Sequence, residues 1–235
     1  MIDHAHDLAS VRDATERLLT AVGKLDNAAV TQPSRLPGWS RGHVLAHLAR
    51  NADALVNVLE GRPMYVSAEA RDGDIERDAP RALDVQLADL RGSAVRFQDA
   101  AEVPADWSRT VELRNGVTDS ASRVPFRRWV EVELHHVDLG IGYELEDLSA
   151  DFTEREIEFL TDRFRGHPDV PPTRVTDGTR AWSTGGDAHG AGARDGAAAV
   201  TVTGSPADLL GWLAGRRTGE ALSVHGGPLP ALPPL

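Results

Sequence analysis

The chain has 235 residues, of which 41% are hydrophobic and 26% charged, so it can bury a sizeable core in one large or two small domains. Its formal net charge of −11 argues against partners such as nucleic acid or anionic membranes, which favour basic surfaces. The absence of cysteine excludes disulfides, thiolate metal ligands and a catalytic protein thiol, so any thiol chemistry needs a thiol from outside. We see no membrane-spanning run and no secretory signal pattern, and therefore expect a cytoplasmic protein.

The first two thirds of the chain are predicted to be helical. Apolar residues recur at helical spacing over 6–25, 40–60 and 80–101, and further helices are expected over about 126–140 and 153–164. Ser40 is the expected N-cap of the second helix, which should stop at Gly61, and Pro80 is expected in the first turn of the third. Long helices with short connections favour an up-down bundle.

The character of the sequence changes after Gly166. A proline-rich linker at 167–172 precedes β-type runs at 173–177, 179–184 and 197–204, with a glycine-rich surface loop expected at 185–196. A short helix should follow over 205–216, capped by Ser205. The chain is therefore predicted to be α+β, with a helical bundle at 1–166 and a small α/β domain at 167–235.

The stretch from Arg127 to Gly140 concentrates polar residues in an apolar helix. Each helical residue advances about 100°, so the apolar positions share one arc that should face the core: Val130, Leu134, Val137 and Ile141. Glu131, His135 and Asp138 form a stripe beside that arc, whereas Glu133 and His136 point elsewhere. Three of the five polar side chains are thus expected along the edge of the buried face.

Glu131 and His135 are spaced to hold one metal ion over a single helical turn. Carboxylate oxygen and imidazole nitrogen suit zinc, and Asp138 is placed either to hold a histidine ring or to act on a substrate. A partly solvated stripe with ordinary ion pairing is the alternative explanation of so short a pattern.

The second helix offers a further ligand. His47 borders its expected core arc, whereas His43 lies further round toward solvent, so His47 is the better inward candidate. Facing helices of a bundle are a usual place for metal sites. Two histidines and one glutamate would leave a zinc position open, which is the pattern of a catalytic site that activates a bound water or thiol.

Four motifs occur in order along the chain: "LPGWSRGHVLAHLARNADAL", "MYVSAEARDGDIE", "RRWVEVELHHVDLG" and "LLGWLAGR". Together they resemble the mycothiol-dependent maleylpyruvate isomerases. The resemblance implies a DinB-like four-helix bundle followed by a small sterol-carrier-like α/β domain, and a zinc ion held by His47, Glu131 and His135. It also implies roles for Asp138 and Arg71 at the catalytic site, and for Arg216 in catalysis and thiol binding.

The arginine assignments remain open at this point, because Arg77, Arg81 and Arg217 are close alternatives. The implied reaction begins with mycothiol bound to zinc as a thiolate, which adds to the cis double bond of maleylpyruvate. Rotation about the resulting single bond and elimination of the thiol give fumarylpyruvate. Arginines would bind the carboxylates of this dicarboxylate substrate.

Two other functions remain open. The same zinc and thiol site would serve a mycothiol S-transferase that acts on another electrophile. A non-catalytic module that binds a small molecule in the C-terminal domain would need no metal.

Overall fold

The computed structural model describes residues 3–103, 106–184 and 200–234, and the chain divides into two compact units, Met1–Tyr143 and Glu144–Leu235. The first unit is helical and the second contains a small sheet, which confirms the predicted α+β class. None of the helices in the described ranges combines the length and the apolar character that a membrane span requires.

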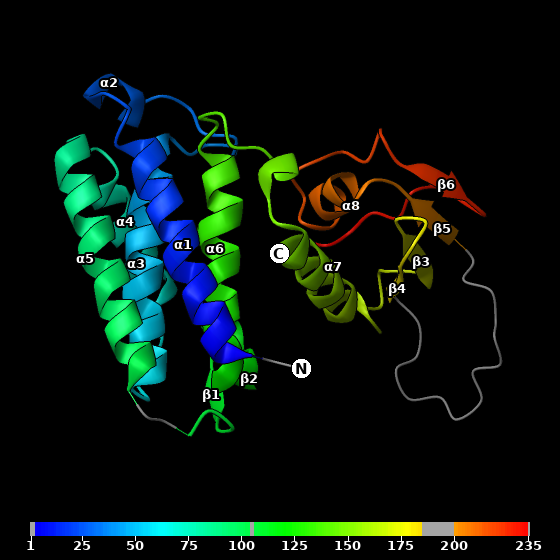
Figure 1. The fold of residues 1–235 in the computed structure, drawn as a ribbon, viewed down its shortest axis with the longest axis horizontal. Coiled ribbons are helices and arrows are strands. Elements are labelled where there is room, and N and C mark those ends of the chain that lie inside the picture. The colour runs from blue at the N-terminus through cyan, green and yellow to red at the C-terminus, as the bar shows by residue number, and fades with distance from the viewer. Residues whose placement is uncertain (1–2, 104–105, 185–199, 235) are drawn as a thin grey trace. The chain divides into compact units, whose positions relative to one another are not determined.

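Four long helices build the first unit, and Figure 1 shows them side by side. They are α1 (His4–Val22), α3 (Arg41–Leu59), α5 (Leu83–Glu102) and α6 (Val124–Asp138). The helix α3 packs against both α5 and α6, while α1 closes the bundle against α6 and α5. The predicted up-down bundle is therefore present, with α3 and α6 in contact.

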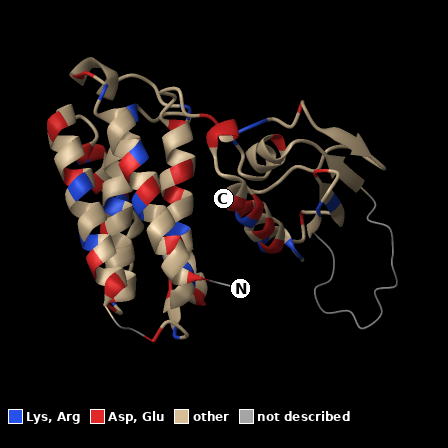
Figure 2. Cartoon of the chain, in the orientation of Figure 1, with Lys and Arg blue, Asp and Glu red and all other residues tan. Residues whose placement is uncertain are grey.

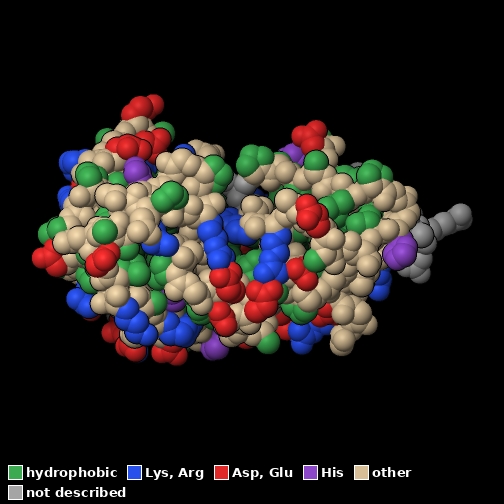
Figure 3. All heavy atoms as spheres, turned by 90° about the horizontal axis from the view of Figure 1, so that it is seen from above, with side chains coloured by type: hydrophobic (Ala, Val, Ile, Leu, Met, Phe, Trp, Pro, Cys, Tyr) green, Lys and Arg blue, Asp and Glu red, His purple; other side chains and the backbone are tan. Residues whose placement is uncertain are grey.

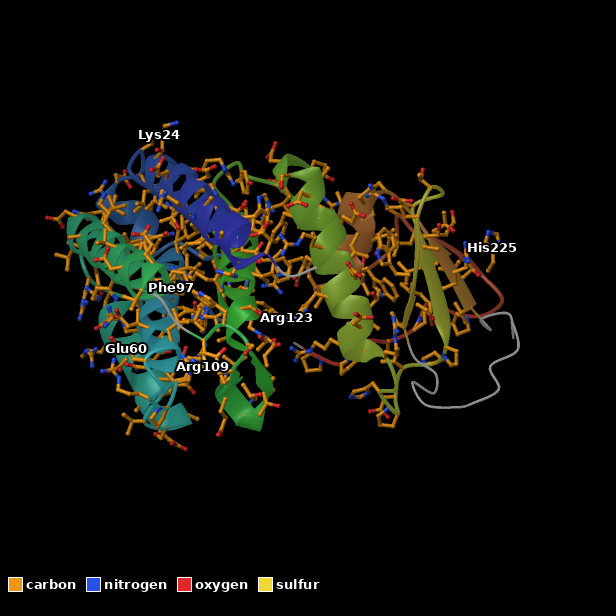
Figure 4. All side chains as sticks on the ribbon, turned by 60° about the horizontal axis from the view of Figure 1, so that its bottom comes forward. Lys24, Glu60, Phe97, Arg109, Arg123 and His225 are labelled. Carbon is orange, nitrogen blue, oxygen red and sulfur yellow. The ribbon has the colours of Figure 1, made fainter. Side chains whose placement is uncertain are left out.

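The bundle core follows the apolar periodicity of the sequence. Leu18, Leu48, Leu90 and Val132, one from each long helix, are fully buried. Phe97 on α5, labelled in Figure 4, is fully buried as well. Arginines and acidic residues are mixed on the outer faces of these helices in Figure 2. On the face drawn in Figure 3, hydrophobic side chains lie in small groups among charged ones.

Shorter elements connect the long helices. The helices α2 (Asn27–Val30) and α4 (Ala68–Asp78) flank α3, and a hairpin of β1 (Thr110–Glu112) and β2 (Thr118–Ser120) precedes α6, with the 3-10 turns η1 (Arg114–Gly116) and η2 (Ala121–Arg123). None of these elements was predicted from the sequence. Pro80 was expected in the first turn of the third helix, but α5 begins at Leu83 and Pro80 lies in the turn before it.

Ser40 caps α3 as predicted, and its hydroxyl accepts a hydrogen bond from the His43 amide. Gly42, in the first turn, lies so close to the end of α4 that a Cβ there would come within 2.1 Å of the Ala79 carbonyl oxygen. Gln86 on α5 donates from Nε2 to the Asp78 carbonyl at 2.9 Å. These contacts fix the carboxyl end of α4 against α3 and α5.

The second unit pairs a four-stranded sheet with two helices. The strand order is β4 (Ala181–Thr184), β3 (Thr173–Thr176), β5 (Val200–Thr203) and β6 (Ser223–His225), with β3 and β5 parallel and the other pairs antiparallel. The helix α7 (Ala150–Phe164) packs against β4 and α8 (Pro206–Leu213), and a short turn, η3 (Leu145–Asp147), also contacts α8. Ser205 caps α8 as predicted.

The boundary between the units differs from the prediction. It lies between Tyr143 and Glu144 rather than at 166/167, because α7 buries its apolar face within the second unit. The helix pattern alone had assigned α7 to the bundle. The loop expected at 185–196 and the first residues of the strand expected at 197–204 lie outside the described residues.

Candidate metal centre

The predicted ligands converge between α3 and α6. His47 lies in the second turn of α3, and Glu131 and His135 lie one turn apart on α6. Oε2 of Glu131 is 3.0 Å from Nε2 of His47 and 3.2 Å from Nε2 of His135. One potential ligand atom from each of the three residues lies within 4.8 Å of the other two. This group, His47, Glu131 and His135, is called the triad below.

Asp138 fixes the orientation of one triad histidine. Its carboxylate oxygen Oδ2 lies 2.8 Å from Nδ1 of His135, and Asp138 is fully buried. A carboxylate accepts hydrogen bonds, so Nδ1 of His135 donates to Asp138, and Nε2 is the nitrogen that faces Glu131. A carboxylate behind a histidine in this way is the usual support for a metal-binding imidazole.

His47 has a different neighbour. Arg71, on α4, brings Nη2 to 3.3 Å from Nδ1 of His47, so this nitrogen accepts a hydrogen bond and Nε2 donates to Glu131. The ring is buried and lies 5.5 Å, centroid to centroid, from the ring of Trp39. Burial lowers the pKa of His47 to about 4, against the opposing effect of Glu131, so the ring is neutral at neutral pH.

The remaining charges of the triad are set by its internal hydrogen bonds. Burial raises the pKa of Glu131, but hydrogen bonds from His135 and His47 outweigh it and hold the pKa well below its usual range. Burial lowers the pKa of His135, but the bonds to Asp138 and Glu131 raise it overall. One ionised carboxylate and two imidazole nitrogens, with about a third of the Glu131 side chain exposed, are a donor set that fits zinc with an accessible position.

The other residues named by the sequence lie away from the triad. His43 accepts a hydrogen bond from the Ser40 amide at 3.1 Å and faces Glu76. Glu133 is buried, where it accepts hydrogen bonds from Arg17 and Trp129, and His136 stacks on the ring of Tyr143. Glu131, His135 and Asp138 therefore contact one another, whereas Glu133 and His136 pair with other residues.

The structure also shows which of the candidate arginines contacts the triad, namely Arg71. Arg77 and Arg81 both form ion pairs with the buried Asp78, and neither is the residue that meets His47. Arg216 belongs to the second unit, where its Nη1 donates to the Ala214 carbonyl at 2.7 Å, while Arg217 pairs with Glu146 and Asp208. A role for Arg216 in catalysis or thiol binding stays a prediction.

Two residues near the triad were missed. Arg128 is 1% exposed and interacts electrostatically with Glu131, and Tyr65 has its ring centroid 5.9 Å from Cζ of Arg71. The spacing could have indicated Arg128, because a residue three positions before Glu131 lies on the same side of the helix. Tyr65 lies in the loop before α4, where no periodicity could have indicated its direction.

Comparisons with known proteins agree with this geometry. The family model of the mycothiol maleylpyruvate isomerase N-terminal domain matches residues 11–140, and that of the MDMPI C-terminal domain matches residues 147–234. The chain belongs to the mycothiol maleylpyruvate isomerase family. Both domain models place their junction near the division between the two units.

Solved structures of the family share the fold. A crystal structure of a mycothiol-dependent maleylpyruvate isomerase matches with a TM-score of 0.85 and 26% identity, over 99% of this chain and 97% of the other. A mutant of a mycothiol-dependent maleylpyruvate isomerase with one histidine changed to alanine matches with the same TM-score and coverage at 25% identity. No curated protein matches the chain.

Proposed function

We propose that the protein is a zinc-dependent, mycothiol-dependent isomerase that converts maleylpyruvate to fumarylpyruvate. The observation that carries the proposal is the convergence of His47, Glu131 and His135 in a chain of this isomerase family. A purely structural cluster would not need two imidazole nitrogens aimed at one carboxylate oxygen. The cytoplasmic location stays a prediction.

The triad would hold the zinc ion through Nε2 of each histidine and a carboxylate oxygen of Glu131. When bound, zinc lowers the pKa of a thiol in its open position and so favours the thiolate at neutral pH. The thiol supplies a nucleophile that adds reversibly to the cis double bond, which becomes a single bond free to rotate before the thiol leaves. The chain has no cysteine of its own that could replace it.

Asp138 acts through His135 in this proposal. Its 2.8 Å contact with Nδ1 and its complete burial favour a role in orienting the ring over one in carrying protons to a substrate. Asp138 is therefore a positioning residue, which narrows the two roles that the sequence left open.

Arg71 is the proposed partner of a substrate carboxylate beside the triad. A neutral histidine that binds a metal through Nε2 carries its proton on Nδ1, and two donors cannot share a hydrogen bond. The contact between Arg71 and Nδ1 of His47 therefore belongs to the metal-free arrangement. With His47 engaged, Nη2 of Arg71 becomes available to a substrate carboxylate, while Nη1 pairs with Asp72 at 2.7 Å.

The test has two stages. Elemental analysis of the purified protein should show close to one zinc per chain, and its absence after growth and purification with added zinc would contradict the site. Maleylpyruvate is then mixed with protein and mycothiol, and fumarylpyruvate is followed by absorbance. Conversion that needs both zinc and mycothiol supports the proposal, whereas zinc binding without conversion would favour the S-transferase alternative.

A further inference from the structure

A cavity of about 610 Å³ lies in the first unit. Its walls are the connection between α3 and α4, residues 61–68, and the region of the β1 hairpin, residues 109–116. Tyr65 belongs to this wall and contacts Arg71, which in turn reaches Nδ1 of His47. One arginine side chain therefore separates the cavity from a proposed zinc ligand.

The cavity wall is basic, although the protein carries a net charge of −11. It contains three arginines, Arg62, Arg109 and Arg114, and one acid, Glu112. Two of the arginines have structural partners. Arg62 donates to Asn57 and pairs with Glu60, and Arg109, labelled in Figure 4, donates to the carbonyls at the end of α3.

Arg114 differs from the other two. Within the residues that the structure describes, its guanidinium makes no hydrogen bond or ion pair, and its electrostatic partner is Tyr65. It sits in the tight turn η1, where the next residue, Asn115, adopts a left-handed conformation with φ of 60°. Asparagine tolerates that conformation better than most residues, so the turn fixes the backbone of Arg114, an exposed residue, on the cavity wall.

Tyr65 supplies a neutral donor beside this cation. Burial raises its pKa, and the negative charge of Glu131 raises it further, so the hydroxyl keeps its proton at neutral pH. A phenol in this state donates a hydrogen bond to an anion without adding charge.

A second, buried cation, Arg128, interacts electrostatically with Tyr65 of the cavity wall. Arg128 donates from Nη1 to the Leu48 carbonyl and to Asn51, but Nη2 is buried without a hydrogen-bond partner in the described structure. Burial lowers its pKa to about 10, which leaves it charged at neutral pH, and it interacts electrostatically with Glu131 and Tyr65. A buried charge with an unused donor is costly, and an anion close by would offset part of that cost.

We propose that this cavity is the subsite for one carboxylate of the dicarboxylate substrate, with Arg114 as the ion-pairing cation and Tyr65 as the neutral donor. The inference rests on the proposed function and deepens it. Arg71 beside the triad and Arg114 on the cavity wall then bind opposite ends of the dianion. Acids with one carboxylate would lose the Arg114 contact, so this pair selects for dicarboxylates.

The central experiment compares Arg114→Gln with the wild-type protein, both loaded with zinc. The KM for maleylpyruvate should rise about tenfold, as for the loss of one charge-assisted hydrogen bond, with a small change in kcat and no change in the KM for mycothiol. Arg114→Lys should recover part of the loss, and Tyr65→Phe should raise the KM by a smaller factor. Arg12→Gln controls for net charge and should leave the KM unchanged. Arg12 is an exposed arginine that pairs with Glu102 and does not line the cavity.

Binding without turnover provides a second readout. Fumarylpyruvate is titrated into zinc-loaded protein by calorimetry in the absence of thiol, and its Kd should rise about tenfold in Arg114→Gln while the zinc content stays the same. An unchanged KM and Kd in Arg114→Gln would overturn the subsite and leave the proposed function standing. A rise confined to the KM for mycothiol would assign the cavity to the thiol and also overturn the subsite. A wild-type protein that neither converts maleylpyruvate nor binds fumarylpyruvate would overturn the proposed function itself.

Discussion

The support that Asp138 gives to His135 should be measurable as zinc affinity. Asp138→Asn keeps the shape of the side chain and an oxygen that can accept from Nδ1, but it removes the charge. Asp138→Ala removes the acceptor as well and leaves the Nδ1 proton buried without its 2.8 Å partner. Loss of a partner behind a metal-binding histidine typically weakens metal binding 10- to 100-fold.

We therefore expect about tenfold weaker zinc binding in Asp138→Asn and about 100-fold in Asp138→Ala, or about 1.4 and 2.8 kcal/mol. Zinc affinity is measured by competition with a chelating dye, and circular dichroism checks that each variant keeps its helices. Glu133→Gln is the matched control, because it changes another buried carboxylate of α6 whose partners are Arg17, Trp129 and Tyr143. Wild-type affinity in both Asp138 variants would refute the assignment of Asp138 as the positioning residue.

The remaining predictions concern the triad and its arginine. His135→Ala should abolish zinc retention and activity while the bundle stays folded, whereas His136→Ala should keep its zinc, as measured by elemental analysis. The reverse result would mean that His136, not His135, is the ligand. His47→Ala should lose zinc in the same measurement, whereas His43→Ala should keep it and lose about 1 kcal/mol of stability in denaturant unfolding with the helix cap. Arg71→Gln should raise the KM for maleylpyruvate roughly tenfold or more at unchanged zinc content, and an unchanged KM would exclude a role in substrate binding. Removal of zinc by a chelator should abolish isomerisation, and added zinc should restore it without a change in helix content; activity that persists in the metal-free protein would contradict the mechanism.

Much of the site could be predicted because helical geometry is regular. The spacing of Glu131, His135 and Asp138 fixes their common side of α6 whatever the rest of the chain does. His47 required a further step, since the pattern of α3 shows only that this residue borders the buried face. The contact between α3 and α6 depends on the packing of the bundle, which no local pattern contains.

The missed elements share a physical reason. The helix α4 has the sequence "AEARDGDIERD", in which Ile75 is the one apolar side chain that becomes buried, so it shows no apolar stripe. Its stability comes from the Ser67 cap, whose hydroxyl accepts from the Ala70 amide, and from the contacts of Asp78 with α5 and the arginines around it. A polar helix held by its ends cannot be recognised from hydrophobic periodicity.

The protonation of Nδ1 could be predicted from the sequence for His135 but not for His47. Asp138 follows His135 on the same helix, so the hydrogen bond that it accepts from Nδ1, with Nε2 left to face Glu131, follows from spacing alone. The partner of His47 is Arg71, which comes from a helix that the sequence did not reveal, and as a donor it favours the opposite tautomer. The ring of His135 is thus already oriented for a metal. His47 must lose its contact with Arg71 and carry a proton on Nδ1 when its Nε2 binds a metal. Spacing could identify the ligands, but that asymmetry depends on a contact between helices.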